Sequence, residues 1–197
     1  DLSVPREFTP AARHKGRYDG KVVERRPNYG LSTEELTSKP VIKRALEIRH
    51  GFEQDDDWAR LIDPGIAENT IRRRAEMMLA VDAGVGRIVH TLDRLGVLED
   101  KLIIFTSDNG YFYGEHGLAV ERRLPYEESV RTPLIMRFPR LIEPGTEVTS
   151  LVVSVDLAPT VLDVAGVEIP RHIQGRSLVP LLSGDTDRVH DAILIEY

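Results

Sequence analysis

Two side chains suited to a hard cation stand together directly after an apolar run. The run is Leu102–Thr106, and Ser107, Asp108, Asn109 and Gly110 follow it. A carboxylate beside an amide carbonyl offers two oxygen donors of the kind that suits Ca²⁺ or Mg²⁺ better than zinc. Asp-Asn-Gly is also a common turn signal. Taken alone, the tripeptide therefore leaves a metal site and a simple turn both open.

Basic side chains follow this acidic pair within a short stretch of sequence. His116 is flanked by glycines, and Arg122 and Arg123 come soon after it. An arginine presents a planar fork of donors that matches the oxygens of sulfate or phosphate. The pattern therefore indicates a tetrahedral oxyanion site beside a metal. The alternative is that the two arginines pair with neighbouring glutamates on a surface helix.

The elements that must position these residues alternate between strand and helix. Helices are expected over 33–50, 68–96 and 157–165, and strands over 102–106, 134–138 and 151–155. This order predicts an α/β fold with a mostly parallel sheet flanked by helices. We expect the 102–106 strand to be parallel and central, with helix 68–96 packed across the sheet. Ligands bind beyond the carboxyl ends of strands in open α/β sheets, which is where Asp108 stands.

Several single residues carry local expectations. Gly96 fits a helix C-cap, and Asp156 is expected to cap the helix that begins at 157. Gly84 and Gly86 inside the long helix indicate close packing against another backbone. The histidines other than His116 lack convergent partners in sequence, and we expect them at the surface or in packing contacts. They are His14, His50, His90, His172 and His190.

Bulk composition excludes some classes of function. The net charge of -6 argues against non-specific nucleic-acid binding. No apolar run approaches the roughly 20 residues of a membrane span. The absence of cysteine excludes disulfides and thiolate metal sites within this stretch. The chain opens at Asp1 rather than Met and stops at Tyr197 after an apolar run, so both ends are expected to be cut.

Several motifs occur in an order that resembles a known family. They are Thr106–Gly110, Gly114–Leu118, Tyr126–Ile135, Val155–Leu162 and Gln174–Leu178, with Val81–Gly86 in the long helix. Together they look like the C-terminal half of the sulfatase catalytic domain, in the alkaline-phosphatase-like superfamily. The similarity extends over about residues 8–197. It implies an incomplete domain whose N-terminal half is absent. Residues 1–66 would form a loop-rich and helical segment near the substrate, and residues 67–197 part of the α/β core.

The resemblance also implies a chemistry. Sulfatases use a formylglycine made from a Cys/Ser-x-Pro-x-Arg motif, with Ca²⁺ as Lewis acid and template. By this resemblance Asp108 and Asn109 are metal ligands for Ca²⁺, with Mg²⁺ as the second choice. The substrate would be a sulfate ester, with glycan sulfates among the candidates. Family likeness favours an extracytoplasmic location, whether periplasmic, secreted or lysosomal.

The sequence departs from the family pattern at three places. The formylglycine motif is missing, and its nearest approach, Ser3–Glu7, ends in Glu rather than Arg. Leu2 and Pro5 stand where relatives carry a lysine and a histidine near the substrate. The usual sulfate-binding lysine is replaced by Arg122, or by Arg123 if the register shifts by one residue. With an arginine there, His116 becomes the nearest candidate to protonate the leaving oxygen.

These observations predict a sulfuric ester hydrolase whose isolated residues 1–197 are inactive, because the nucleophile and half the metal shell are missing. A phosphodiesterase or phosphonate hydrolase of the same superfamily is the first alternative. A non-catalytic binding domain that retains the fold is the second.

Overall fold

The computed structural model describes residues 8–30, 35, 38, 40, 67–116 and 125–195. The chain forms two compact units. One holds the residues up to Thr91 together with Ser107–Thr132, and the other holds Leu92–Thr106 together with the residues from Pro133 onward. Most of the predicted helix over 33–50 lies outside the described residues, as do Arg122 and Arg123. The division of the chain at residue 66 stays a prediction.

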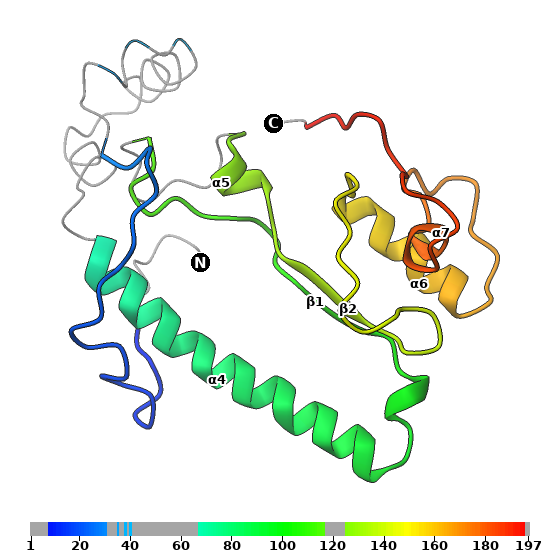
Figure 1. The fold of residues 1–197 in the computed structure, drawn as a ribbon, viewed down its shortest axis with the longest axis horizontal. Coiled ribbons are helices and arrows are strands. Elements are labelled where there is room, and N and C mark those ends of the chain that lie inside the picture. The colour runs from blue at the N-terminus through cyan, green and yellow to red at the C-terminus, as the bar shows by residue number, and fades with distance from the viewer. Residues whose placement is uncertain are drawn as a thin grey trace. The chain divides into compact units, whose positions relative to one another are not determined.

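The long helix α4 runs from Ala67 to Arg94 and confirms the helix expected over 68–96 (Figure 1). Its first turn carries an acidic side chain and its last turn a basic one, which complements the helix dipole. Gly96 ends it with a φ of 66°, and the Val97 N–H bonds to the Leu92 carbonyl at 3.0 Å. This is the expected glycine C-cap. Within the described part of the chain, no helix is both long and apolar enough for a bilayer crossing.

The glycines of α4 do not mark a close contact. A Cβ placed on Gly86 would meet no atom within 4 Å, and one on Gly84 would meet only the Arg87 side chain, at 3.8 Å. Among the described residues the predicted close backbone packing is therefore wrong. Apolar side chains along α4 also remain open: Met78 is 49% exposed and Ile88 is 60% exposed.

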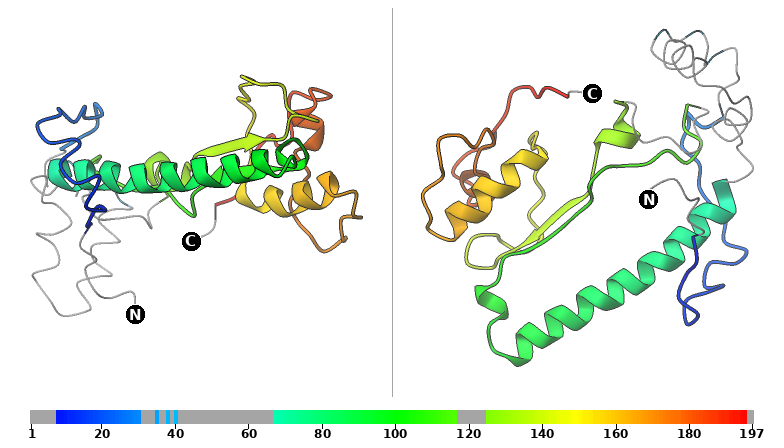
Figure 2. Two further views of the ribbon diagram at one scale, coloured as in Figure 1. Left: turned by 90° about the horizontal axis from the view of Figure 1, so that it is seen from below. Right: turned by 180° about the vertical axis from the view of Figure 1, so that it is seen from behind.

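The described sheet consists of two strands that lie side by side (Figure 1, Figure 2). Strand β1 spans Ile103–Thr106 and β2 spans Leu134–Arg137, which confirms two of the three predicted strands. They pair antiparallel, with Thr106 opposite Leu134. The connecting segment leaves and returns at the same end of the sheet, and such a connection produces antiparallel pairing. A parallel neighbour that would make β1 central is not seen among the described residues and stays a prediction.

The third predicted strand, over 151–155, is wrong. Within the part of the chain that the structure describes, residues 151–153 pair with no strand, and Ser154–Asp156 form the short 3₁₀ helix η3. The Asp156 carboxylate accepts a hydrogen bond from the Val153 N–H at 3.0 Å, and the Asp156 N–H bonds back to the Val153 carbonyl at 2.9 Å. These two bonds turn the backbone and occupy groups that a strand ladder would need.

Helix α6, Leu157–Val164, organises the core of the second unit. Asp156 precedes it, but makes no side-chain capping bond to its first turn, so the predicted capping role is wrong. The hydroxyl of the buried Thr160, on this helix, accepts a hydrogen bond from the Leu178 N–H at 2.8 Å. Leu178 leads into helix α7, Val179–Leu182, and is 1% exposed. The motif Gln174–Leu178 is thus explained by packing along α6. The remaining short helices are η2, Leu98–Asp100, and α5, Glu127–Val130.

Candidate functional site

The loop after β1 presents two oxygen donors. Asp108 is exposed, and its Oδ1 accepts the Asn109 N–H at 2.9 Å. The Asn109 Nδ2 donates to the Gly110 carbonyl at 2.6 Å, which fixes the orientation of the amide. Within the described chain, neither Asp108 Oδ2 nor Asn109 Oδ1 accepts a hydrogen bond. The loop therefore offers one carboxylate oxygen and one amide oxygen for a hard cation.

Gly110 shows that Asp-Asn-Gly is more than a turn signal. Its N–H donates to the Ser129 carbonyl at 2.7 Å, a tertiary contact outside the loop. A Cβ on Gly110 would overlap the Glu128 carbonyl oxygen and lie 3.1 Å from the Arg131 carbonyl oxygen. The glycine is needed because the loop lies directly against the backbone of α5. The loop thus has a tertiary contact that a simple turn does not need, and its metal-binding role stays a prediction.

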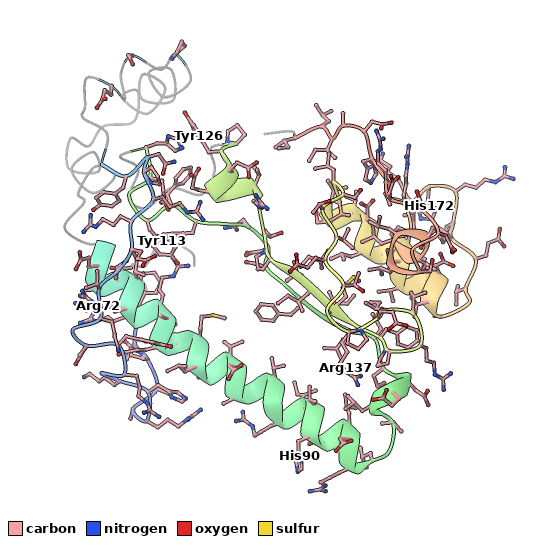
Figure 3. The ribbon with its side chains drawn as sticks, in the orientation of Figure 1. Arg72, His90, Tyr113, Tyr126, Arg137 and His172 are labelled. Carbon is pink, nitrogen blue, oxygen red and sulfur yellow. The ribbon has the colours of Figure 1, made fainter. Side chains whose placement is uncertain are left out.

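Helix α5 joins three of the sequence motifs. The Ser129 carbonyl holds the Asp108–Gly110 loop, and the Ser129 N–H is bonded to the Tyr126 carbonyl at 2.9 Å. The Tyr126 ring lies 4.5 Å from the His116 ring, measured between centroids. Figure 3 labels Tyr126, at the start of α5, and Tyr113, in the segment that leads to His116. Residues far apart in sequence therefore form one cluster within the first unit.

A preceding segment, 26–30, pairs with the glycine-flanked histidine. The Gly30 N–H bonds to the Gly114 carbonyl at 3.0 Å, and the His116 N–H bonds to the Asn28 carbonyl at 2.7 Å. Gly114 has a φ of 104°, and a Cβ there would overlap the Tyr29 ring. His116 has a φ of 55°, unusual for a residue with a side chain. Both positions are therefore tightly constrained by the docked segment.

One nitrogen of the His116 ring, Nε2, faces two polar groups. Its side chain is 17% exposed, and its Nε2 lies 3.3 Å from Glu128 Oε2. The same nitrogen lies 3.1 Å from Asn28 Nδ2, which in turn donates to Glu128 Oε1 at 2.9 Å. His116, Glu128 and Asn28 thus form a closed triangle of contacts.

Two buried carboxylates share one arginine in this cluster. The Arg26 guanidinium lies 3.7 Å from Glu115 Oε1 and 3.7 Å from Glu128 Oε1. Burial alone would raise the pKa of Glu128, but the Asn28 hydrogen bond and the charges of His116 and Arg26 hold that pKa below its usual value. Burial, and then the Glu128 charge, raise the pKa of Tyr126. Glu128 is therefore ionised at neutral pH.

Arg74 anchors the segment between the two motifs to α4. Its guanidinium lies 4.0 Å from the centre of the Tyr111 ring, 5.1 Å from that of Tyr113 and 5.0 Å from that of Phe8. Such cation–π contacts are worth about 0.5–2 kcal/mol each. Burial raises the pKa of Tyr113. The backbone that follows Asn109 is therefore fixed on both sides, by α5 and by α4.

The structure brings some of the predicted site residues together. Asp108 and Asn109 share one loop, and α5 links that loop to His116. Arg122 and Arg123 lie outside the described residues, so their roles stay predictions. No group of three His, Cys, Asp or Glu side chains able to hold a metal occurs among the described residues. The two oxygens suit Ca²⁺ or Mg²⁺ chemically, but they are a small part of a full shell.

Sequence reasoning missed Asn28, Glu128 and Arg26 as parts of this cluster. Glu128 lies inside a recognised motif, and its position two residues after Tyr126 was the available signal. Asn28 is 88 residues away from His116 in sequence, and no local pattern marks it.

The other described histidines differ in their surroundings. His90 and His172 are exposed, as expected (Figure 3). His190 is different, because its Nε2 lies 2.8 Å from the fully buried Asp156 carboxylate. This contact is consistent with packing, but the charged partner was not foreseen.

Comparison with known proteins connects the cluster to a family. The family described as N-sulphoglucosamine sulphohydrolase, C-terminal, matches residues 114–197. An N-acetylglucosamine-6-O-sulfatase from Bacteroides thetaiotaomicron is 46% identical over 108 residues, which is 55% of this chain and 19% of that protein. The chain therefore spans only a small part of this curated relative.

Solved structures give a similar result. One protein, determined in complex with its substrate D-glucosamine-2-N,6-O-disulfate, superposes with a TM-score of 0.69 and 28% identity, over 96% of this chain and 47% of the other. A phosphonate monoester hydrolase from Silicibacter pomeroyi superposes with a TM-score of 0.65 and 28% identity, over 89% of this chain and 35% of the other.

Proposed function

This chain belongs to the sulfatase family, matching its C-terminal portion, and we propose that it supplies the metal- and sulfate-binding half of a site that hydrolyses sulfuric esters. One observation carries the proposal. The Asp108–Gly110 loop and His116, eight residues or less apart along the chain, both contact α5, and so the polar motifs form one supported cluster. The solved relatives have an alkaline-phosphatase-like fold, and a mostly parallel sheet is part of the proposal.

Asp108 and Asn109 are assigned to a divalent cation, Ca²⁺ or else Mg²⁺. The exposed Asp108 carboxylate and the fixed Asn109 amide supply hard oxygens, which suit either ion. When bound, such an ion polarises sulfate oxygens as a Lewis acid and holds the nucleophile. The other oxygens of its shell, and the formylglycine nucleophile, come in this proposal from outside residues 1–197.

Arg122 is assigned to the sulfate group. The transferred sulfuryl group keeps negative charge on its oxygens, so a fixed cation beside it lowers the barrier. Arginine stays protonated and cannot act as the leaving-group acid, and that role is assigned to His116. As the S–O bond breaks, its electron pair goes to the leaving oxygen, which takes the proton from the His116 imidazolium. The sulfuryl group passes to the oxygen nucleophile.

The substrate class is proposed as a sulfated glycan that contains glucosamine. A similar sulfatase is named for N-acetylglucosamine 6-O-sulfate, and a similar solved protein holds a disulfated glucosamine as its substrate. These ligands belong to those proteins, and they support the class without fixing which sulfate is removed. An extracytoplasmic location is proposed with the same family likeness as support.

A phosphonate hydrolase is the second candidate. It is favoured by the likeness to the phosphonate monoester hydrolase, which is nearly as strong as that to the glucosamine-disulfate protein. The nucleophile separates the two candidates, because formylglycine in a Cys/Ser-x-Pro-x-Arg motif favours sulfate and threonine favours phosphate. The match to a sulphohydrolase family over residues 114–197 supports the sulfatase proposal.

Paired arginine substitutions test the sulfate assignment in the full encoded protein. Arg122→Ala should lower kcat/KM for a sulfate ester by roughly 10²-fold or more, as loss of an oxyanion-stabilising donor does. Arg123→Ala should cost less than about 1 kcal/mol, as an exposed charge does. If Arg123→Ala lost most of its kcat/KM while Arg122→Ala kept the wild-type value, the sulfate would be assigned to Arg123 instead. Sulfate-ester turnover by isolated residues 1–197 would contradict the assignment of the nucleophile to another segment.

A further inference from the structure

We propose that Glu128 is a positioning residue for His116, acting together with Asn28 to fix the imidazole in the orientation from which it protonates the leaving oxygen. The proposal rests on the proposed sulfatase function, and it goes beyond it by naming how the acid is held. Among the described residues, the Glu128 side chain has hydrogen-bond and ion-pair partners in Asn28, Arg26 and His116, and not in Asp108 or Asn109.

The Glu128 carboxylate is itself fixed in place. Its Oε1 accepts the Asn28 amide at 2.9 Å and lies 3.7 Å from Arg26 Nη1. Its side chain is only 6% exposed. The α5 backbone that carries it is bonded through Ser129 to both Gly110 and Tyr126. A carboxylate with so little freedom can impose its orientation on the ring that faces it.

The donors and acceptors around Nε2 define what each partner does. Asn28 Nδ2 is only a donor, so it can hydrogen bond to an unprotonated Nε2, at 3.1 Å. Glu128 Oε2 is only an acceptor when ionised, so it can bond to a protonated Nε2, at 3.3 Å. The pair can therefore hold the ring whether or not Nε2 carries a proton. With Nε2 directed at this pair, the proposal assigns Nδ1 to the substrate.

An ionised carboxylate faces the His116 ring. Among the described residues, the Glu128 carboxylate is the charged group closest to Nε2. Burial alone would raise its pKa, but the Asn28 hydrogen bond and the charges of His116 and Arg26 hold that pKa below its usual value. Arg26 lies on the far side of Glu128 and also pairs with Glu115. Tyr126, whose ring packs against that of His116, has a pKa raised by burial and so stays neutral. Glu128 is thus the ionised group that faces Nε2 and can orient the ring.

The backbone of His116 supports the same reading. Its φ of 55° costs free energy for a residue with a side chain, and the bond from its N–H to the Asn28 carbonyl maintains it. Asn28 therefore restrains both the backbone and the ring of one residue. Such convergence on a single side chain is expected where its orientation matters to the chemistry.

The test compares two neighbouring glutamates on α5. Glu128→Gln keeps the shape and the Oε1 acceptor but removes the charge facing His116. Glu127→Gln is the matched control, because the Glu127 side chain is 71% exposed and pairs only with Arg131, at 3.5 Å, among the described residues. Both variants are made in the full encoded protein, and a cooperative thermal unfolding transition above the assay temperature shows that each has folded.

Two substrates separate positioning from general damage. A sugar sulfate has a poor leaving group that needs protonation, whereas 4-nitrophenyl sulfate has a good one that does not. Glu128→Gln should lower kcat on the sugar sulfate by about 10²-fold, the scale of general-acid catalysis, and on the aryl sulfate by less than about 3-fold. Asn28→Ala should show the same imbalance, and Glu127→Gln should show none. Equal losses on both substrates, or no loss, would overturn the proposal.

A second measurement keeps this proposal separable from the proposed function. If the wild-type protein cleaves no sulfate ester, the sulfatase proposal fails, and the positioning claim is read from imidazole ¹⁵N NMR signals, with His116→Gln identifying the His116 resonances. Changed His116 nitrogen shifts in Glu128→Gln, and unchanged ones in Glu127→Gln, support positioning. Identical His116 shifts in the wild-type protein and Glu128→Gln would overturn it.

Discussion

Replacing Gly110 by alanine tests whether α5 sets the position of the Asp108–Asn109 loop. The new Cβ would overlap the Glu128 carbonyl oxygen and lie 2.9 Å from its carbonyl carbon, whereas real Cβ contacts are essentially never closer than 3.0 Å. The neighbouring atoms are backbone, which cannot swing aside as a flexible side chain does. The loop must therefore move away from α5 by about 1 Å, a displacement that can lower turnover by roughly 10²-fold.

The same change should have a moderate effect on stability. Overpacking of a well-packed site costs about 1–3 kcal/mol, and the Gly110 N–H bond to Ser129, worth about 1 kcal/mol, is strained as well. We therefore expect Gly110→Ala to remain folded, with a free energy of unfolding lower by about 2–3 kcal/mol in urea titrations. Its calcium affinity and its kcat/KM for a sulfate ester should fall much further than this loss of stability explains.

Gly86→Ala in α4 is the matched control. A Cβ at Gly86 meets nothing within 4 Å, and alanine is favoured over glycine in a helix by about 1 kcal/mol. This variant should be as stable as the wild-type protein or more so, with unchanged calcium binding. Wild-type calcium affinity and turnover in Gly110→Ala would refute the reasoning, because the loop would then not depend on its seat against α5.

Three further predictions follow from single side chains. Asp108→Ala should remove bound calcium, measured by metal analysis, and leave the melting temperature nearly unchanged, because the side chain is exposed; normal calcium content would count against the metal assignment. Asp156→Ala should lower the free energy of unfolding by roughly 3 kcal/mol or more, because removing this fully buried carboxylate leaves several hydrogen-bond donors unpaired. Asp163→Ala, at an exposed carboxylate, is the control and should cost less than about 1 kcal/mol. Equal urea midpoints for the two variants would show that Asp156 is not a structural anchor. Folding lowers the pKa of Glu128, so its ionised form contributes stability that is complete above the unfolded-state pKa and is lost as pH falls through the folded-state pKa. Glu128→Gln should therefore flatten the acid loss of stability between about pH 5 and pH 3. An unchanged dependence of the free energy of unfolding on pH would contradict this.

The parts of the fold predictable from sequence were those set by local patterns. Helix α4 follows from apolar residues at helical spacing and from Gly96, whose φ of 66° matches the predicted cap. The two strands β1 and β2 follow from short apolar runs. The run over 151–155 has the same composition, but the Asp156 carboxylate turns its backbone into η3. An apolar run alone cannot reveal such a side-chain contact.

Some residues of the candidate site could likewise be predicted from sequence, and others could not. Asp108 and Asn109 were identifiable because they follow a strand directly, and His116 because glycines flank it. The partners of His116 depend on tertiary contacts: Asn28 comes from a distant segment, and Glu128 becomes a partner only because α5 turns its side chain toward the ring. No spacing rule in the sequence encodes those contacts.

The most direct test of the proposed function is the release of inorganic sulfate by the full encoded protein from glucosamine 6-O-sulfate, measured with and without a calcium chelator. The account predicts sulfate release that stops when the chelator is added and returns with added Ca²⁺. Asp108→Ala, in the exposed loop that is proposed to bind the metal, should show no release. Hydrolysis of a phosphonate monoester without any sulfate release would contradict the account and favour the phosphonate hydrolase alternative.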